Sequence, residues 1–140
     1  MAHSTKLSDA LHILVFIHEQ QDADLSSVAI AFSLKANPAS VRQMMSRLRK
    51  AGIIESVVGH AKPTLTKSPN EITMFEVYKA VEGNKPLLHL DTHTNPECGI
   101  GVKVQLAIGD FYQEIQEGVN QQMASITLAD VINAYKKRVD

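Results

Sequence analysis

Residues 89–101 gather side chains that bind metals or react with oxidants. They include His89, Asp91, His93 and Cys98, the single cysteine of the chain. The first three alternate, so an extended backbone would place them on one face, with Cys98 as a fourth ligand of a type that suits zinc. The spacing matches no standard structural zinc site. These residues are therefore weak metal candidates, and no metal site is predicted.

Two other interpretations of Cys98 stay open. A cysteine near the start of a helix can be a small apolar residue that packs without reacting. Alternatively, a thiolate at a helix N-terminus is stabilised there and is oxidised selectively, to a sulfenic acid, a mixed disulfide or a bridge between subunits. Glu97 beside it opposes thiolate formation. A single cysteine excludes an internal disulfide and fits a reducing compartment.

A second stretch, residues 35–67, is strongly basic. It holds seven lysines and arginines against one acid, Glu55, which gives +6, whereas the remainder of the chain carries −7. A basic block inside an acidic protein is the electrostatic footprint of a nucleic-acid-binding face. A solvated basic surface would give the same count, so the charge needs a structural context.

That context is a predicted helix over residues 38–51, capped by Asn37 and opened by Pro38. Val41, Met44, Met45 and Leu48 recur at helical spacing and form one apolar stripe. A short capped helix and a three-residue turn precede it, which is the spacing of a helix-turn-helix. The candidate base-reading residues are Ser40, Arg42, Gln43 and Ser46, and the candidate phosphate contacts are Arg47, Arg49, Lys50, Ser26, Ser27 and Lys62.

The remaining elements follow from periodicity and capping signals. We predict a first helix over 7–21 with Ser8 as N-cap, a second after the cap Ser26, and a hairpin of 53–58 with 63–66. Thr73 and Glu76 form a capping box before a helix over 75–83. Residues 84–99 are irregular, a long helix spans about 102–123, and Thr127 with Asp130 caps a short last helix.

The long helix carries an apolar stripe that the rest of the chain is too short to cover. Its members repeat at spacings of four, three, four and four: Val104, Ile108, Phe111, Ile115 and Val119. An uncovered stripe of this length needs a partner, so we predict that it forms a dimer interface.

The ordered set of motifs resembles the Rrf-type family of winged-helix transcriptional regulators, which includes the iron–sulfur cluster regulator and the cysteine-metabolism repressor. The resemblance rests on "SRLRKAGII", "EIT" followed by "VYKAVEG", and "NPEC" leading into the long helix, and it spans nearly the whole chain. It implies a mainly α fold with a small β-hairpin wing, and a homodimeric DNA-binding repressor whose long helix crosses its partner's copy. The implied domains are a winged helix-turn-helix (1–83), a connecting or sensor loop (84–101), and the dimerisation helix with a short last helix (102–140).

The chain departs from that family at two places. Val58 stands where family wings carry a minor-groove arginine, and Ala61-Lys62-Pro63 replaces their glycines, which leaves Lys62, with His60 beside the turn, as the substitute. Cluster-binding members supply three cysteines at six-residue spacings. Cys98 matches the middle one, but Thr92 and Val104 occupy the flanking positions. One thiolate does not hold a cluster, so no iron–sulfur cofactor is expected.

The leading hypothesis is a sequence-specific transcriptional regulator that binds a pseudo-palindromic operator as a homodimer, with thiol oxidation at Cys98 as one candidate signal. The alternative is a winged-helix module for protein interaction or dimerisation, without DNA. An enzyme is not expected, because the sequence has no Gly-rich phosphate loop and no nucleophile elbow. It also has no membrane-length apolar run and no signal-peptide pattern, so we expect a cytoplasmic protein.

Overall fold

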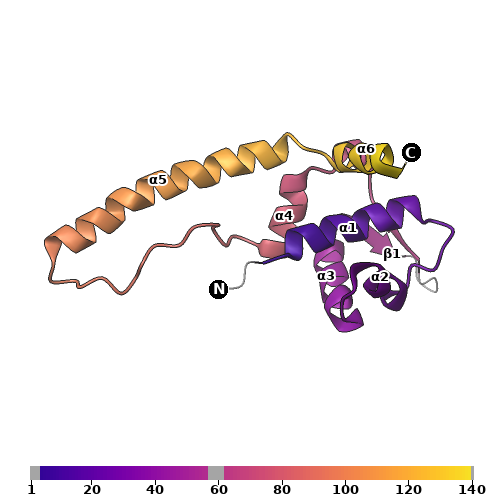
Figure 1. Cartoon of the computed structure of the whole chain (residues 1–140), viewed down its shortest axis with the longest axis horizontal. Coiled ribbons are helices and arrows are strands. Elements are labelled where there is room, and N and C mark those ends of the chain that lie inside the picture. Colours follow the sequence, from indigo (N-terminus) through magenta and orange to yellow (C-terminus); the bar gives the residue numbers. More distant parts are fainter. Residues whose placement is uncertain (1–3, 57–61, 140) are drawn as a thin grey trace.

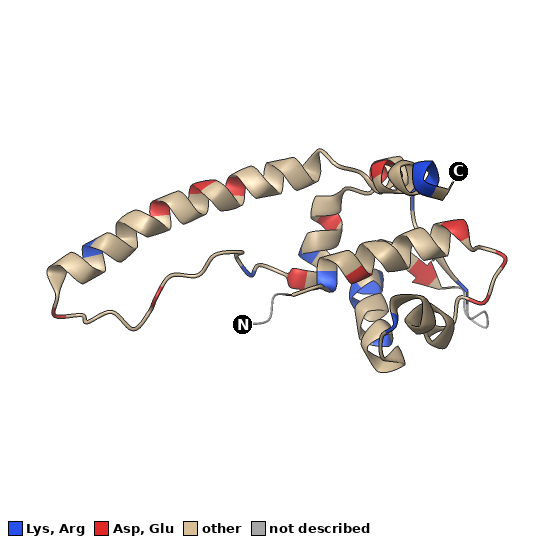
Figure 2. Ribbon diagram, viewed as in Figure 1, with Lys and Arg blue, Asp and Glu red and all other residues tan. Residues whose placement is uncertain are grey.

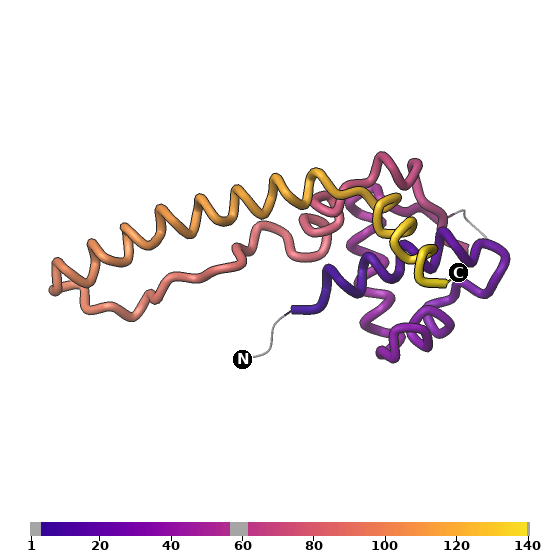
Figure 3. The backbone as a smooth tube through the Cα atoms, turned by 45° about the horizontal axis from the view of Figure 1, so that its top comes forward, coloured from indigo at the N-terminus to yellow at the C-terminus, as the bar shows by residue number. Residues whose placement is uncertain are grey.

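The computed structural model describes residues 4–56 and 62–139, which form a head and a projecting arm (Figures 1 and 3). The arm consists of residues 84–98, which run outward from the head, and α5 (Gly99–Ala124), which returns alongside them. The head holds α1 (Lys6–Glu19), α2 (Ser27–Leu34), α3 (Pro38–Lys50), β1 (Ile54–Ser56), β2 (Pro63–Leu65), the 3-10 turn η1 (Pro69–Glu71), α4 (Met74–Glu82) and α6 (Leu128–Val139). This confirms the predicted mainly helical fold with one small antiparallel hairpin.

The core of the head lies where α1 meets α3, α4 and α6. Ile13 of α1, Leu48 of α3 and Val77 of α4 are completely buried in one apolar cluster. The last helix joins the same cluster through Leu128 and Ile132, which are 1% and 3% exposed. The domains implied by the resemblance group α6 with the dimerisation helix. In the structure, the buried face of α6 completes the core of the head.

Helix α4 carries both attachments of the arm. At its start, the Met74 N–H donates to the Ile126 carbonyl at 2.8 Å, and the Leu128 N–H donates to the Ile72 carbonyl at 2.8 Å. The predicted capping box is present, with Glu76 N–H donating to Thr73 Oγ1 at 3.1 Å. At its other end the chain leaves α4 for residues 84–98. The arm therefore departs from one end of α4 and returns to the other.

The arm is held together along its length, although α5 has no buried residue. The Leu87 N–H donates to Gln116 Oε1 at 2.8 Å, which fastens the outgoing segment, residues 84–98, to α5. Gly109 permits a close approach, because a Cβ there would lie 3.2 Å from Leu90 Cδ1. None of the helices in the described part of the chain combines the length and apolar character needed to cross a bilayer.

The structure corrects three helix boundaries. Helix α1 begins at Lys6 and ends at Glu19, so Ser8 lies inside its first turn and is not the N-cap; Thr5 holds that position. Helix α5 begins at Gly99, three residues before the predicted start, because Cys98 acts as its N-cap and the two glycines that follow obscured the helical pattern. The predicted caps at Ser26, Asn37 and Thr127 are confirmed by their hydrogen bonds.

Candidate nucleic-acid interface

The connection between α2 and α3 is a tight turn of three residues. Lys35 adopts the left-handed region at φ 53°, and the Ala36 N–H donates to the Ala31 carbonyl at 2.9 Å, which closes α2. Asn37 Oδ1 accepts from the Ala39 N–H at 2.7 Å. Pro38 is the first residue of α3, where the N–H that proline lacks would have no partner within the helix. These caps place α3 across α2 in a helix-turn-helix.

Helix α3 turns its apolar stripe inward and its polar side outward. Val41, Met45 and Leu48 are buried, and Met44 is half-buried. On the opposite side Gln43 and Lys50 are exposed. The predicted candidates Ser40, Arg42, Arg47 and Arg49 are exposed too, and Ser46 is half-buried. The structure therefore brings the candidates of α3 onto one surface of the head.

The three arginines of α3 each reach a different neighbouring element. Arg42 Nη1 donates to Ser27 Oγ of α2 at 3.4 Å, and Arg49 Nη2 donates to Ser56 Oγ of β1 at 3.1 Å. Arg47 Nη1 donates to the Val81 carbonyl at 3.0 Å, in the last turn of α4. An arginine has five donors, so each retains N–H groups for a phosphate or a base. The bonds hold the guanidinium groups in place before any ligand arrives.

The first turn of α2 is less open to an anion than the sequence implied. Ser26 Oγ already accepts from the Ala29 N–H at 3.2 Å, and Asp24 Oδ1 accepts from the Ser26 N–H at 2.9 Å. This backbone hydrogen bond, with a contribution from the Ser26 hydroxyl and a smaller one from the charge of Lys62, lowers the pKa of Asp24 below its usual value. A phosphate at this turn would therefore meet a carboxylate. Ser27, which is half-buried, reaches the interface through Arg42.

The hairpin after α3 occupies the position of a wing. β1 and β2 pair antiparallel, with Ile54 opposite Leu65 and Ser56 opposite Pro63. Gly52, at φ +75°, supplies the turn out of α3 that most side chains resist. Lys62 precedes β2 and is exposed, whereas Val58, His60 and Ala61 lie outside the described residues.

Charge separates along the molecule. Figure 2 marks basic residues in blue on the ribbon of α3, which carries four of them and no acid. Acidic side chains are spaced along α5 at Asp110, Glu114 and Glu117. The outer surface of α3 is thus positive and the arm is negative, which directs a polyanion to the head.

A basic α3 displayed on a helix-turn-helix with an adjoining hairpin is an arrangement that enters a major groove. Residues 3–134 match the family Rrf2, described as iron-dependent transcriptional regulators. The chain belongs to the Rrf2 family. It is a DNA-binding transcriptional regulator and not an enzyme.

Several relatives share this architecture. YwnA of Bacillus subtilis, named as an HTH-type transcriptional regulator, is 37% identical over 130 residues, which cover 93% of this chain and 96% of YwnA. A solved structure described as a DNA-binding protein is 36% identical, with a TM-score of 0.75 over 91% of this chain and 98% of that one. CymR of B. subtilis, described as a global cysteine regulator, shares the fold at 22% identity and a TM-score of 0.68, over 96% and 98% of the two chains.

The Rrf2 description names iron, but the residues at the corresponding place in this chain do not fit an iron–sulfur cluster. Cys98 is the sole cysteine of the chain and is exposed. The Cys98 Sγ accepts from the Gly101 N–H at 3.4 Å. Thr92 and Val104 hold the two other positions. Clusters are held by several thiolates, and a hydroxyl and an isopropyl group do not replace them.

The weak metal candidates do not come together either. Residues 89–93 are irregular rather than extended, and Asp91 Oδ1 accepts from the His93 N–H at 2.8 Å, so the carboxylate turns back on its own backbone. Within residues 4–56 and 62–139, no three His, Cys, Asp or Glu side chains are placed to hold a metal ion.

Three of the five predicted dimer-interface residues are exposed on α5, and the other two are partly covered. Phe111 is 66% exposed, Ile115 48% and Val104 46%, and Ile108 and Val119 are half-buried. Ile100 and Leu106, at 77% and 66%, are further exposed apolar residues that the sequence stripe missed. Leu106 was missed because it lies about 160° round the helix from Val104, outside a single stripe.

Sequence reasoning also missed Asp24 and the arginine tethers. Asp24 had a signal, because an aspartate two residues before a helix cap is a common turn-forming position. The bond from Arg47 to Val81 had none, since the two residues are 34 apart in the chain and only the packing of α3 on α4 brings them together.

Proposed function

We propose that this protein is a homodimeric repressor that binds a pseudo-palindromic operator, with one α3 in the major groove of each half-site. The observation that carries the proposal is α3 itself, which displays four basic residues, Gln43 and Ser40 on the outer surface of a helix-turn-helix. Repression is supported by the family resemblance. A DNA-binding regulator with bacterial relatives acts where the chromosome lies, so we place it in the cytoplasm.

The exposed surface of the chain supports a dimer. A folded monomer of 15.4 kDa exposes about 7,200 Å² by the usual size scaling, whereas this chain exposes 9434 Å². The excess is roughly 2,200 Å² per chain, and permanent dimers bury about 2,000–5,000 Å² in total. Helix α5, which has no buried residue, contributes to this excess. A second copy of the chain would cover it.

We assign roles by position on α3. Gln43, Ser40, Arg42 and Ser46, in the N-terminal part, would meet base edges, where an amide pairs well with adenine and a guanidinium with guanine. Lys50 and Arg49, nearer the end, would meet phosphates, with Arg47, Lys62 and Ser27 beside them. A phosphate contact at Ser26 is not expected, because its hydroxyl caps α2 and its N–H already donates to Asp24.

The test begins with a duplex selected by the wild-type protein from a random-sequence pool. Binding should fall with a log–log salt slope of about −0.9 per neutralised phosphate, and Lys50→Ala should reduce that slope by about 0.9 per protomer, equally on all sequences. Gln43→Ala should instead cost about 1–3 kcal/mol at one base pair and relax the preference there. Equal, uniform losses for both variants would contradict these roles. Failure to enrich any duplex, with salt-insensitive binding to another protein, would favour the interaction module.

We also propose that the regulator works without a cluster and that Cys98 senses oxidants. Its exposure argues against the packed, inert interpretation, and its Sγ accepts from the Gly101 N–H at 3.4 Å in the first turn of α5. The thiolate would attack a peroxide oxygen, so that the O–O bond breaks and a sulfenic acid and hydroxide result.

Hydrogen peroxide should therefore weaken the binding of wild-type protein to the selected duplex by about tenfold or more and leave Cys98→Ser unchanged. Binding is measured by gel shift, and a thiol reductant should restore it. Loss of binding in both proteins would place the oxidation elsewhere, for example on a methionine.

A further inference from the structure

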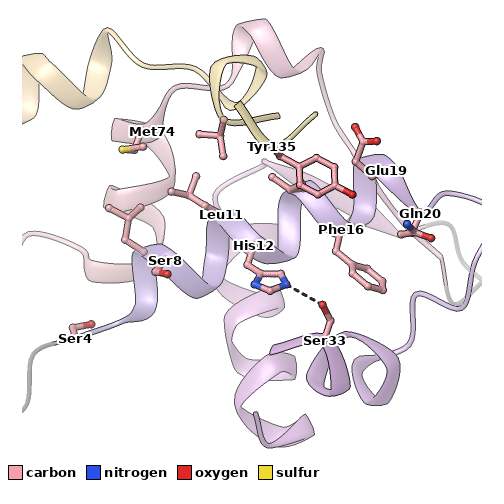
Figure 4. A pocket seen from close by; sticks show the side chains of 13 residues that line it. Ser4, Ser8, Leu11, His12, Phe16, Glu19, Gln20, Ser33, Met74 and Tyr135 are labelled. Carbon is pink, nitrogen blue, oxygen red and sulfur yellow. Dashed lines mark hydrogen bonds between the residues drawn. The ribbon is translucent and has the colours of Figure 1, made fainter. Parts of the chain in front are cut away.

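Two apolar side chains of α2 are uncovered on the helix-turn-helix. Phe32 is 89% exposed, the highest value among the large apolar residues that the structure describes, and Val28 is 64% exposed. Because they are four residues apart, they lie about 40° apart round α2 and are neighbours on its surface. On other sides α2 packs on the core and is bonded to α1, where His12 Nε2 and Ser33 Oγ share a hydrogen bond of 2.9 Å (Figure 4). Val28 and Phe32 together form the α2 patch.

The α2 patch lies on the part of the head that faces DNA. In a helix-turn-helix the first helix crosses the DNA backbone while the second enters the groove. Helix α2 lies beside α3 on the side of the head away from α6 (Figure 1), and Arg42 Nη1 of α3 donates to Ser27 Oγ of α2 at 3.4 Å. A valine and a phenylalanine cannot neutralise a phosphate or donate a hydrogen bond to it. The patch is therefore suited to a protein surface beside the operator rather than to the DNA backbone.

Opposite charges lie beyond the two ends of the α2 patch. Asp24 precedes α2 and is exposed, and the hydrogen bond from the Ser26 N–H lowers its pKa, so its carboxylate is ionised at neutral pH. Lys35 follows α2 as its C-cap and is exposed too. The patch therefore has a negative end and a positive end.

This distribution makes the α2 patch complementary to a second copy of itself. A two-fold axis across the middle of α2, near Ile30, would bring Val28 of each copy to Phe32 of the other. The same axis would bring Asp24 of each copy close to Lys35 of the other. Two α2 helices in antiparallel contact would therefore join apolar to apolar and negative to positive.

We propose that α2 of one bound dimer packs antiparallel on α2 of a second dimer that occupies the neighbouring stretch of the same DNA. The inference rests on the operator-binding dimer proposed above and adds a contact between two such dimers. Four side chains bury far less than the roughly 1,200 Å² of a stable interface, so the contact does not hold free dimers together. It acts between neighbours on one duplex, where the effective concentration is high, and makes their binding cooperative.

The test compares one and two copies of the selected operator on one duplex, with the spacer between the two copies varied one base pair at a time. At the spacing that aligns the two α2 helices, we expect the second dimer to bind about 10–100-fold more tightly than the first. About five further base pairs should abolish this cooperative gain, because half a helical turn moves the second dimer to the opposite side of the DNA. Quantitative gel shifts resolve singly and doubly bound duplexes.

Phe32→Gln removes the apolar contact and keeps a residue that favours a helix. It should reduce the cooperative gain to about twofold or less and leave binding to the single operator unchanged. Phe32→Leu is the matched control, because it keeps an apolar side chain at the same position and should retain most of the gain. Both variants should fold normally, since Phe32 is 89% exposed, and circular dichroism checks this.

Charge reversal tests the antiparallel arrangement. Asp24→Lys or Lys35→Glu alone places like charges together at both ends of the contact and should reduce the cooperative gain about three- to tenfold. The double variant exchanges the two charges and should restore the gain. The gain is the ratio of the affinities for the second and the first operator, so an effect of the new charges on DNA binding itself cancels.

Equal affinity for the two operators at every spacing would overturn the proposal. So would a Phe32→Gln loss that is as large on the single operator as on the pair, because it would place Phe32 against DNA. A double charge variant no more cooperative than its single variants would overturn the antiparallel arrangement. A chain that occupies a single operator as a monomer would contradict the homodimer proposed above, but a gain that Phe32→Gln removes would still support the α2 contact.

Discussion

Phe111→Glu is expected to turn the protein into a monomer and to weaken binding to its selected duplex by about 100-fold or more. Phe111 lies at the middle of α5 and is 66% exposed in the single chain, so the variant should fold normally. In the proposed dimer, however, the substitution would remove an aromatic anchor and bury a carboxylate on both copies. Losses of about 2 kcal/mol or more at each of two equivalent sites raise the dimer dissociation constant about 1,000-fold.

The effect on DNA follows from the link between the two heads. A joined pair binds its second half-site from an effective concentration in the millimolar range, which a monomer lacks. Sedimentation equilibrium measures the dimer, and fluorescence anisotropy on whole and half operators measures the DNA. Gln121→Glu adds the same charge on another side of α5 and should leave both measurements unchanged. Tight binding of a monomeric variant to the whole operator would show that α5 does not link the heads.

Leu48→Ala is expected to destabilise the head by about 2–5 kcal/mol, a large fraction of the 5–15 kcal/mol that holds most domains together. Leu48 belongs to α3 and is completely buried in the cluster that α1, α4 and α6 share. Its loss would leave a cavity under the reading helix, where the rigid neighbours close only in part. We therefore also expect the position of α3 on the head to become less fixed.

Urea unfolding at a fixed protein concentration measures this change, because dimerisation itself adds to the apparent stability. Met44→Ala is the matched control, since Met44 belongs to the same apolar stripe but is only half-buried. It should cost about 1 kcal/mol. Equal losses for the two variants would mean that α3 is not anchored through Leu48.

Much of the head could be predicted because its signals are local. Ser26, Asn37 and Thr73 cap their helices as their sequence positions indicate, and the spacing of Val41, Met45 and Leu48 identifies the inner side of α3. The outer candidates followed directly, because a helix with one face buried exposes the opposite one.

The rest depends on packing between segments that are distant in sequence. Arg47, a predicted phosphate contact, also donates to the carbonyl of Val81, because the last turn of α4 lies beside it. A pocket between α1 and α6 brings together Leu11 and Tyr135, which no local pattern connects (Figure 4). The start of α5 was missed because Cys98 and two glycines are poor helix signals, although Cys98 acts as its cap.

The two attachments of the arm to α4 make it an insertion within the head rather than a tail. The chain leaves at Gly83 and is bonded again to Met74 through Ile126, so the two roots of the arm are separated by one nine-residue helix, about 14 Å long. Two attachment points at opposite ends of α4 restrict rotation of the arm relative to the head in the plane that contains them, whereas a single attachment point would allow it. The distance between the two α3 helices of the proposed dimer should therefore be nearly fixed. The protein should accept operators with only one separation between half-sites.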